Sequence, residues 1–117
     1  MTAPDEDAIT RCVLDYFEGW FDADPERMRR ALHPELAKRS LGSEGLRQVT
    51  ASQMVNETEA GAGRRLDSAA RRIDVRVVEV YGDIATAVVD SHVYREYVHL
   101  VRTDGDWKIV NALWAFT

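Results

Sequence analysis

The clearest pattern in the chain is the alternation of apolar and polar residues over its last twenty positions. Two apolar runs flank Thr103-Asp104-Gly105, and a three-residue loop with glycine in the left-handed region is a common hairpin connection. The pattern therefore predicts two antiparallel strands between Tyr97 and Phe116. With Gly105 as a bulge residue, Arg102 would lie opposite Asp106.

Two further strands precede this hairpin. Residues 72–81 alternate apolar with charged side chains, and the adjacent Val77-Val78 indicates a bulge. Gly82-Asp83 is typical of a tight turn into a second strand over residues 84–94. Arg95-Glu96 is then predicted to turn the chain again, so that four long antiparallel strands end the chain.

Helical periodicity dominates the N-terminal half. Apolar side chains spaced three and four apart form one stripe over residues 5–22, which predicts an amphipathic helix. Asp24-Pro25 supplies an N-cap and a first-turn proline for a short helix that ends near Leu32. A capping box at residues 50–53 predicts a third helix that begins at Ala51 and buries Met54 and Val55. It would stop at the Gly61-Ala62-Gly63 break.

A small hairpin is predicted between the second and third helices, because Gly42-Ser43-Glu44-Gly45 separates two short apolar runs. The order of helices, hairpin and strands predicts an α+β fold in which helices cover one face of an antiparallel sheet.

Carrying the alternation through the predicted turns sorts the strand residues into two faces. We assign the face with few hydrogen-bonding side chains to the concave, helix-covered side: Ala85, Ala87, Val89, Ser91, Val93, Val98, Leu100, Val110, Ala112, Trp114 and Phe116. We assign the aromatic and histidine-rich face to a convex subunit interface: Val88, Asp90, His92, Tyr94, Tyr97, His99, Trp107, Asn111 and Leu113.

Length and composition narrow the class of protein. A chain of 117 residues is expected to form a single domain over residues 1–117. The net charge of −5 argues against nucleic-acid binding, which requires clustered Lys and Arg. One cysteine, Cys12, excludes an intrachain disulfide and is expected to be inert packing. With no signal-peptide pattern and no membrane-length apolar run, a cytoplasmic protein is expected.

The wide end of such a curved sheet is expected to hold a pocket. Its predicted lining is Tyr16, Trp20, Met54, Leu100 and Trp114. His33, Lys38 and Arg39 would lie near the mouth. Because alternate strand residues point to opposite faces, only one of Lys38 and Arg39 can face a ligand, and Arg39 is the candidate. Its charge favours an anionic or carbonyl-bearing molecule.

Four segments of the chain together resemble a known family: YFEGWFDADPERMRRALHPELAKRSL, QMVNETEAGAG, IDVRVVEVYGDIATAVVDS and YVHLVRTDGDWKIVNALW. They are similar to the lumazine-binding family within the nuclear transport factor 2-like superfamily, which includes SnoaL-like and ketosteroid-isomerase-like proteins. The resemblance implies a cone-shaped α+β barrel whose curved sheet wraps around N-terminal helices. It also implies a pocket at the wide end and a homodimer through the convex sheet, and no cofactor is expected.

Three functions remain open. The first is a noncatalytic domain that binds a planar, partly polar small molecule. The second is an isomerase, dehydratase or cyclase with Tyr16 or His33 as the catalytic candidate. Steroid-type isomerisation is disfavoured because the concave set contains no carboxylate on the last three strands. The third is a pure dimerisation scaffold.

A histidine cluster is the remaining candidate for chemistry. Asp90, His92 and His99 could act as an acid–base group or bind a metal only if they lay on the inner face. We instead expect a cross-strand histidine pair at an interface and no metal site.

Overall fold

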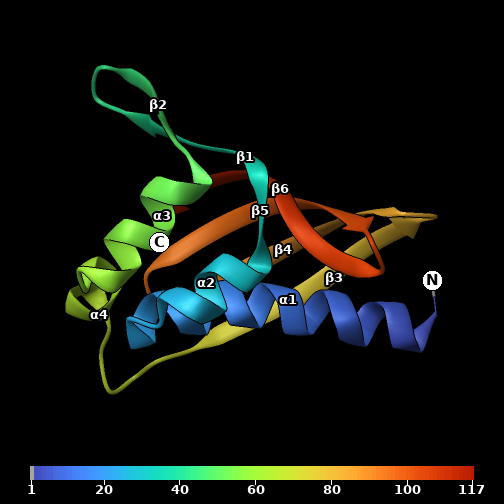
Figure 1. Ribbon diagram of the computed structural model, residues 1–117. Coiled ribbons are helices and arrows are strands. Elements are labelled where there is room, and N and C mark those ends of the chain that lie inside the picture. Colours follow the sequence, from blue (N-terminus) through green and yellow to red (C-terminus); the bar gives the residue numbers. More distant parts are fainter. Residues whose placement is uncertain (1) are drawn as a thin grey trace.

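The computed structural model describes residues 2–117 and shows an α+β fold of two layers (Figure 1). Its elements in chain order are α1 (Ala3–Asp22), α2 (Pro25–Ala31), β1 (Leu32–Gly42), β2 (Gly45–Val49), α3 (Ala51–Glu59), α4 (Ala62–Leu66), β3 (Ile73–Tyr81), β4 (Ile84–Ser91), β5 (Tyr94–Thr103) and β6 (Asp106–Phe116). Helix α1 crosses one face of a curved sheet, and α3 and α4 lie toward one end of it. The predicted fold class is confirmed.

The six strands form one sheet in the order β2-β1-β6-β5-β4-β3. All neighbouring pairs are antiparallel except β1 and β6, which are parallel. The predicted hairpin is β1–β2, and the four antiparallel strands are β3 to β6. The parallel pair makes the sheet mixed, and it brings residues near position 38 beside residues near position 112.

Local signals set the helix starts as predicted. The Asp24 side chain accepts a hydrogen bond from the backbone of Arg27 at the start of α2. Thr50 and Gln53 form the reciprocal capping box of α3. Helix α1 begins two residues earlier than predicted because Thr2 acts as its N-cap.

The C-terminal hairpin differs from the prediction in its register. Asp104 and Gly105 both have positive φ, 52° and 85°, as a two-residue type I′ turn requires. Arg102 therefore lies opposite Trp107 rather than Asp106. An extra residue in β6, Val110, then restores the expected alternation, because His99 pairs with Asn111 while Leu100 pairs with Ile109.

The turn between β4 and β5 lies at His92-Val93, so the predicted turn at Arg95-Glu96 is wrong. The Ser91 hydroxyl holds this turn. It accepts hydrogen bonds from the backbone N–H groups of Val93 and Tyr94 and donates to the carbonyl of Tyr94. Strand β5 consequently begins at Tyr94, and Glu96 lies within it rather than at its end.

These two shifts correct the face assignment. Tyr94 and Trp107, assigned to the convex face, are buried on the helix side, whereas Val110 lines a groove on the outer face. Val93 and His92 lie in a turn. The remaining buried members of the concave set are confirmed: Ala85, Ala87, Val89, Ser91, Val98, Leu100 and Ala112.

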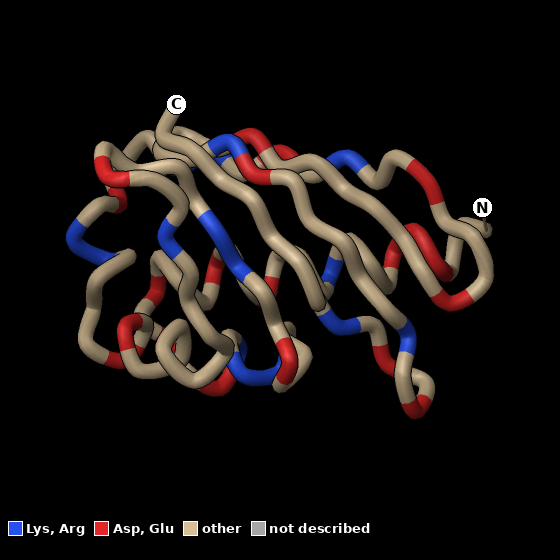
Figure 2. The backbone as a smooth tube through the Cα atoms, turned by 90° about the horizontal axis from the view of Figure 1, so that it is seen from above, with Lys and Arg blue, Asp and Glu red and all other residues tan. Residues whose placement is uncertain are grey.

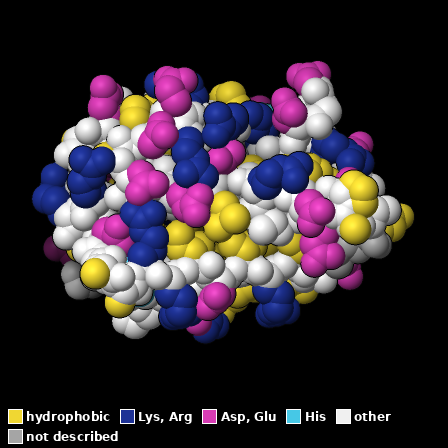
Figure 3. Space-filling model, turned by 90° about the horizontal axis from the view of Figure 1, so that it is seen from below, with side chains coloured by type: hydrophobic (Ala, Val, Ile, Leu, Met, Phe, Trp, Pro, Cys, Tyr) yellow, Lys and Arg dark blue, Asp and Glu magenta, His cyan; other side chains and the backbone are white. Residues whose placement is uncertain are grey.

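Charged residues are spread over both layers of the molecule. In the view from above, most of each strand is tan, with blue and red positions scattered along it (Figure 2). Seen from below, the side on which α1 lies, acidic and basic side chains are interspersed (Figure 3). Among them, Asp15 of α1 bridges Arg27 and Arg30 of α2. Every helix among residues 2–117 is too short or too polar to cross a membrane.

Cys12 is buried in α1, and its thiol contacts the carbonyl of Ala31. Burial raises the pKa of this thiol to about 12, so it stays protonated and unreactive at neutral pH. This agrees with the predicted packing role.

Candidate functional site

Three polar side chains converge inside the fold, and we call them the buried triad: Tyr16, Lys38 and Glu96. Their exposed fractions are 3%, 8% and 2%. The Lys38 Nζ donates to the Tyr16 hydroxyl over 2.5 Å, and that hydroxyl donates to the Glu96 Oε2 over 2.5 Å. The tyrosine therefore links an amine to a carboxyl group in one hydrogen-bonded row.

Three different elements position the triad. Tyr16 lies on the apolar stripe of α1. The parallel pairing of β1 with β6 sets Lys38 beside Ala112, and the antiparallel pairing of β5 with β6 sets Glu96 beside Trp114. Because Ala112 and Trp114 are two residues apart on one strand, both charged side chains face the helices.

Burial dominates the electrostatics of the triad. It lowers the pKa of Lys38, and the negative charge of Glu96 opposes that shift. Burial raises the pKa of Glu96, and the Lys38 charge and the Tyr16 hydrogen bond oppose that shift. Burial and the Glu96 charge raise the pKa of Tyr16 well above its usual value. The amine and the carboxyl group are thus brought closer in proton affinity, with a phenol between them.

Four aromatic rings form a cluster that adjoins the triad through Trp20, Tyr94 and Trp114, and we call them the aromatic gate: Trp20, Tyr94, Trp114 and Phe116. The Trp20 Nε1 donates to the Tyr94 hydroxyl over 3.0 Å. The ring of Tyr94 lies 5.2 Å from that of Trp114 and 5.6 Å from that of Phe116. Trp20 and Trp114 are half-buried and Phe116 is 65% exposed. The gate therefore separates the triad from solvent.

The aromatic rings also surround the Lys38 amine. Its Nζ lies 4.9 Å from the ring centre of Tyr16, 5.8 Å from that of Trp20 and 5.7 Å from that of Trp114. These distances are within the range of cation–π attraction. A positive charge at this point is thus stabilised by ring faces as well as by Glu96.

A cavity of about 10 Å³ separates the triad from the gate. Its lining is Tyr16, Phe17, Trp20, Lys38, Tyr94 and Glu96. This is room for about one water molecule. Any larger ligand requires the gate to move, and the single Trp20–Tyr94 hydrogen bond is the polar contact that such a movement breaks.

Of the residues predicted to line a pocket, the structure brings Tyr16, Trp20 and Trp114 together at this site. Met54 and Leu100 are buried in the hydrophobic core outside the cavity lining.

The three polar residues predicted at the mouth of the pocket, His33, Lys38 and Arg39, do not lie together in the structure. The ring Nδ1 of His33 accepts a hydrogen bond from the backbone of Glu35 at the start of β1. Arg39 is exposed and pairs with Leu113, on the face of the sheet opposite Lys38. Lys38 is therefore the basic residue that faces the interior.

Sequence reasoning missed Glu96 because it was placed in a turn. It missed Tyr94 because that residue was placed at the end of the preceding strand, on the convex face. The alternation of Tyr94, Glu96, Val98 and Leu100 was a usable signal, since these four residues share one face. The carboxylate-free concave face was the argument against isomerase chemistry. Glu96 overturns that argument.

The expected cross-strand histidine pair does not form, because His92 lies in the β4–β5 turn and His99 lies opposite Thr86 and Asn111. Asp90 pairs with Arg72 and Arg95, and His99 contacts Asn111 on the outer face. Within residues 2–117, no group of three or more His, Cys, Asp or Glu side chains is arranged to hold a metal.

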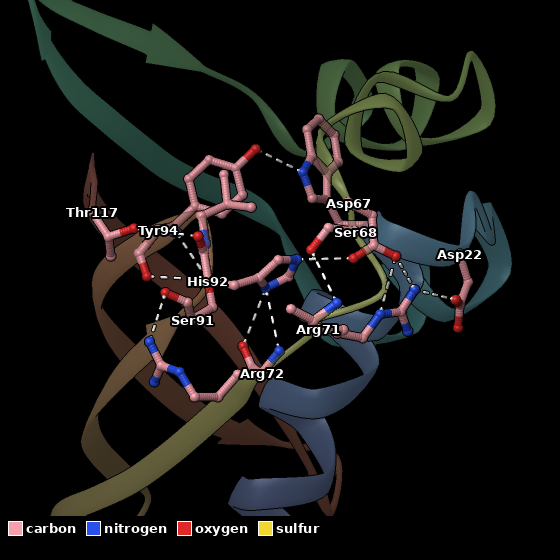
Figure 4. A network of polar contacts seen from close by, with 12 residues as sticks. Asp22, Asp67, Ser68, Arg71, Arg72, Ser91, His92, Tyr94 and Thr117 are labelled. Carbon is pink, nitrogen blue, oxygen red and sulfur yellow. Dashed lines mark hydrogen bonds and ion pairs between the residues drawn. The ribbon is translucent and has the colours of Figure 1, made fainter.

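His92 instead joins a network at the end of the sheet (Figure 4). Its Nε2 lies 2.9 Å from the carboxylate of Asp67, which Arg71 also contacts, and Arg71 reaches Asp22 of α1. The network ties the segment before β3 to α1 and to the β4–β5 turn. Its polar atoms are occupied by one another, which indicates a structural role.

Comparisons with known proteins identify the family and the fold of this chain. A family model described as "Putative lumazine-binding" matches residues 4–115. The structure is similar to a nuclear transport factor 2-like protein of unknown function from Silicibacter pomeroyi, with 18% identity, 100% of both chains covered and a TM-score of 0.78. A similar protein of unknown function from Shewanella baltica shows 16% identity, covers 100% of this chain and 98% of that one, and has a TM-score of 0.76.

A domain of unknown function with a cystatin-like fold from Nostoc punctiforme is 13% identical, with 100% of this chain and 80% of that chain covered and a TM-score of 0.71. No curated protein matches the sequence. At these identities the structural likenesses establish the fold alone.

Proposed function

The chain belongs to the lumazine-binding family, and we propose that it binds a planar small molecule bearing a carbonyl or anionic oxygen. The observation that carries this proposal is the buried triad behind an aromatic gate. Buried polar groups at the end of an apolar slot orient a ligand, while the apolar walls supply most of the affinity.

The triad offers the Lys38 amine as a donor to a ligand oxygen. The Lys38 amine and the Tyr16 hydroxyl lie 2.5 Å apart and belong to the same cavity lining. An oxygen that reached the cavity would displace at most about one water molecule. It would accept a hydrogen bond from the Lys38 amine, because the single proton of the Tyr16 hydroxyl is donated to Glu96. The flat part of the ligand would lie among the gate rings.

A thermal-shift screen tests the proposal with planar metabolites: pterins including lumazine, flavins, steroids and aromatic polyketides. A compound at a hundred times its dissociation constant adds about 2.7 kcal/mol of stability, which is a shift of several degrees in a domain of this size. We expect a hit, and we expect Trp20→Ala to abolish it because one wall of the slot is lost.

The matched control is Arg39→Ala, which alters the neighbouring basic residue on the opposite face and should leave affinity unchanged. If no planar compound in the screen raises the melting temperature, the binding proposal is rejected and the scaffold function is favoured.

An enzyme is the second candidate, and Glu96 is the observation that favours it. A tyrosine beside a carboxyl group whose pKa is raised by burial can donate hydrogen bonds to an oxyanion, as in ketosteroid isomerases. Lys38 lies on the inner face of the sheet, and in its neutral form it would be the catalytic base of such an enzyme. Turnover of a hit compound that Tyr16→Phe removes without loss of binding would support this candidate.

We also propose that the outer face of the sheet forms a homodimer. Tyr97 and Leu113 are paired across strands and are 52% and 50% exposed. A groove of about 350 Å³ lies beside them, with Tyr81 and Ile84 among its lining residues. An exposed apolar sheet face of this kind is suited to a self-complementary interface.

Sedimentation velocity tests the dimer. We expect a dimer at micromolar concentration and a monomer for Leu113→Glu, because a carboxylate would be buried in the interface. Leu66→Glu is the control, since Leu66 is 46% exposed on helix α4, in the helical layer rather than on the outer face of the sheet. A monomeric parent protein, or a Leu113→Glu variant that remains dimeric, rules out this interface.

A further inference from the structure

We propose that Lys38 is a nucleophile that condenses with an aldehyde or ketone to form an imine behind the aromatic gate. The inference rests on the proposed function, because the carbonyl compound would enter the same cavity. It goes further in naming a covalent step and the atom that performs it.

Lys38 has the surroundings that such an amine needs. Of the fifteen Lys and Arg residues only Lys38 and Lys108 are lysines, and arginine cannot lose its proton in a protein. No direct ion pair among the described residues includes Lys38, because its hydrogen-bond partner, the phenol of Tyr16, lies between its amine and the Glu96 carboxyl group. Burial lowers its pKa and so increases the share of neutral, nucleophilic amine.

The triad also provides a route for the proton. The ammonium of Lys38 can give a proton to the Tyr16 oxygen while the Tyr16 hydroxyl gives its own proton to Glu96. The result is a neutral amine, an unchanged phenol and a carboxylic acid. The raised pKa of Glu96 favours its holding that proton.

The condensation then balances without any co-reactant. The Lys38 nitrogen forms a bond to the carbonyl carbon, the carbonyl π bond breaks, and a proton moves from nitrogen to oxygen through Tyr16 to give a carbinolamine. Glu96 returns its proton through Tyr16 to the carbinolamine hydroxyl. The C–O bond breaks, water leaves, and a protonated imine remains beside the Glu96 carboxylate.

The site suits the products of this step. The positive charge of the protonated imine would lie where the Lys38 amine now lies, within 6 Å of the ring centres of Tyr16, Trp20 and Trp114. The cavity of about 10 Å³ accommodates about one released water molecule.

Reductive trapping tests the proposal. The purified protein is incubated with acetaldehyde and sodium cyanoborohydride, and ethylation is measured by mass spectrometry of its peptides. We expect Lys38 to be modified faster than Lys108, because burial lowers the pKa of Lys38 and so increases its share of neutral amine, and because the triad supplies a proton route. The rate at Lys38 should also persist to lower pH than the rate at Lys108.

Lys108 is an internal control, since it donates to the backbone carbonyl of Arg30 and lies outside the triad. Peptide mapping separates both lysines from the terminal amine. Tyr16→Phe, which keeps the ring and removes the proton route, should slow the modification of Lys38 by about a hundredfold and leave Lys108 unchanged.

Modification of Lys38 no faster than Lys108, or with the same pH profile, overturns the proposal. The result can be told apart from that of the planar-ligand screen, because trapping is measured as a covalent product and does not require a planar compound to bind. If a planar compound binds but Lys38 is not trapped, the binding function is supported and the proposal that Lys38 is a nucleophile is rejected. If Lys38 is trapped but no planar compound binds, the nucleophile is supported and the planar-ligand function is rejected.

Discussion

Glu96→Leu is expected to lower the free energy of unfolding by about 3–5 kcal/mol, because it leaves the buried Lys38 ammonium without its counter-charge. The Tyr16 hydroxyl also loses the acceptor of its hydrogen bond. Urea unfolding followed by circular dichroism measures the loss. Glu59→Leu is the control, since Glu59 is exposed on α3 and surface substitutions usually change stability by less than about 0.5 kcal/mol.

The pH dependence of the Glu96→Leu variant has a definite sign. The pKa of Lys38 is lowered in the folded protein even with Glu96 present. At a pH below that lowered pKa, the folded protein must bury a charged amine, and this reduces its free energy of unfolding. The penalty fades as the pH rises toward 10.5, the ordinary lysine value. The unfolding free energy of Glu96→Leu should therefore rise with pH from neutral to alkaline conditions, and a flat profile would contradict a buried ammonium.

A second substitution separates the charge effect from the loss of packing. Lys38→Met in the Glu96→Leu background removes the unpaired charge and keeps a side chain of similar length. The double variant should be more stable than Glu96→Leu alone. If the stability losses of the single variants Glu96→Leu and Lys38→Met simply add in the double variant, Lys38 and Glu96 are not coupled in the folded state.

Gly63→Ala is expected to destabilise the protein by about 1–3 kcal/mol or more, because α4 packs directly against Trp20. A Cβ at Gly63 would lie 2.4 Å from the backbone oxygen of Trp20 and 2.5 Å from two atoms of its indole ring. Neither the backbone nor the ring can yield without moving α1 or opening the aromatic gate. We expect a lower urea midpoint and a changed tryptophan fluorescence spectrum.

The matched control is Gly19→Ala on α1, where the nearest atom to a new Cβ is 3.1 Å away. Its cost should be clearly smaller. Alanine is a better helix former than glycine by about 1 kcal/mol, so helix propensity alone would make Gly63→Ala stabilising. A neutral or stabilised Gly63→Ala would show that α4 does not hold Trp20 in place.

The sequence by itself predicted the features that depend on neighbouring residues. Caps at Asp24 and Thr50 locate the starts of α2 and α3, because a side chain reaches only its own helix end. The alternation of residues predicted β3, β4 and β6, and the stripe of α1 placed Tyr16 and Trp20 on its buried side. These signals were sufficient for the fold class.

The candidate site was only half predictable. Tyr16, Trp20 and Trp114 were expected at the pocket, but Lys38 could not be chosen over Arg39. That choice depends on which face of β1 meets the helices, and the parallel pairing of β1 with β6 decides it. Such a pairing joins segments more than seventy residues apart, and no local pattern specifies it.

Only the tertiary structure placed Glu96 inside. Its position depends on a turn at His92-Val93 that contains no glycine and is held by the Ser91 hydroxyl. A one-residue change of register sends every side chain of a strand to the other face. The sequence therefore determined the fold class and most of the strands and helices, whereas packing on α1 and the turn geometry decided which carboxyl group meets Tyr16 and Lys38.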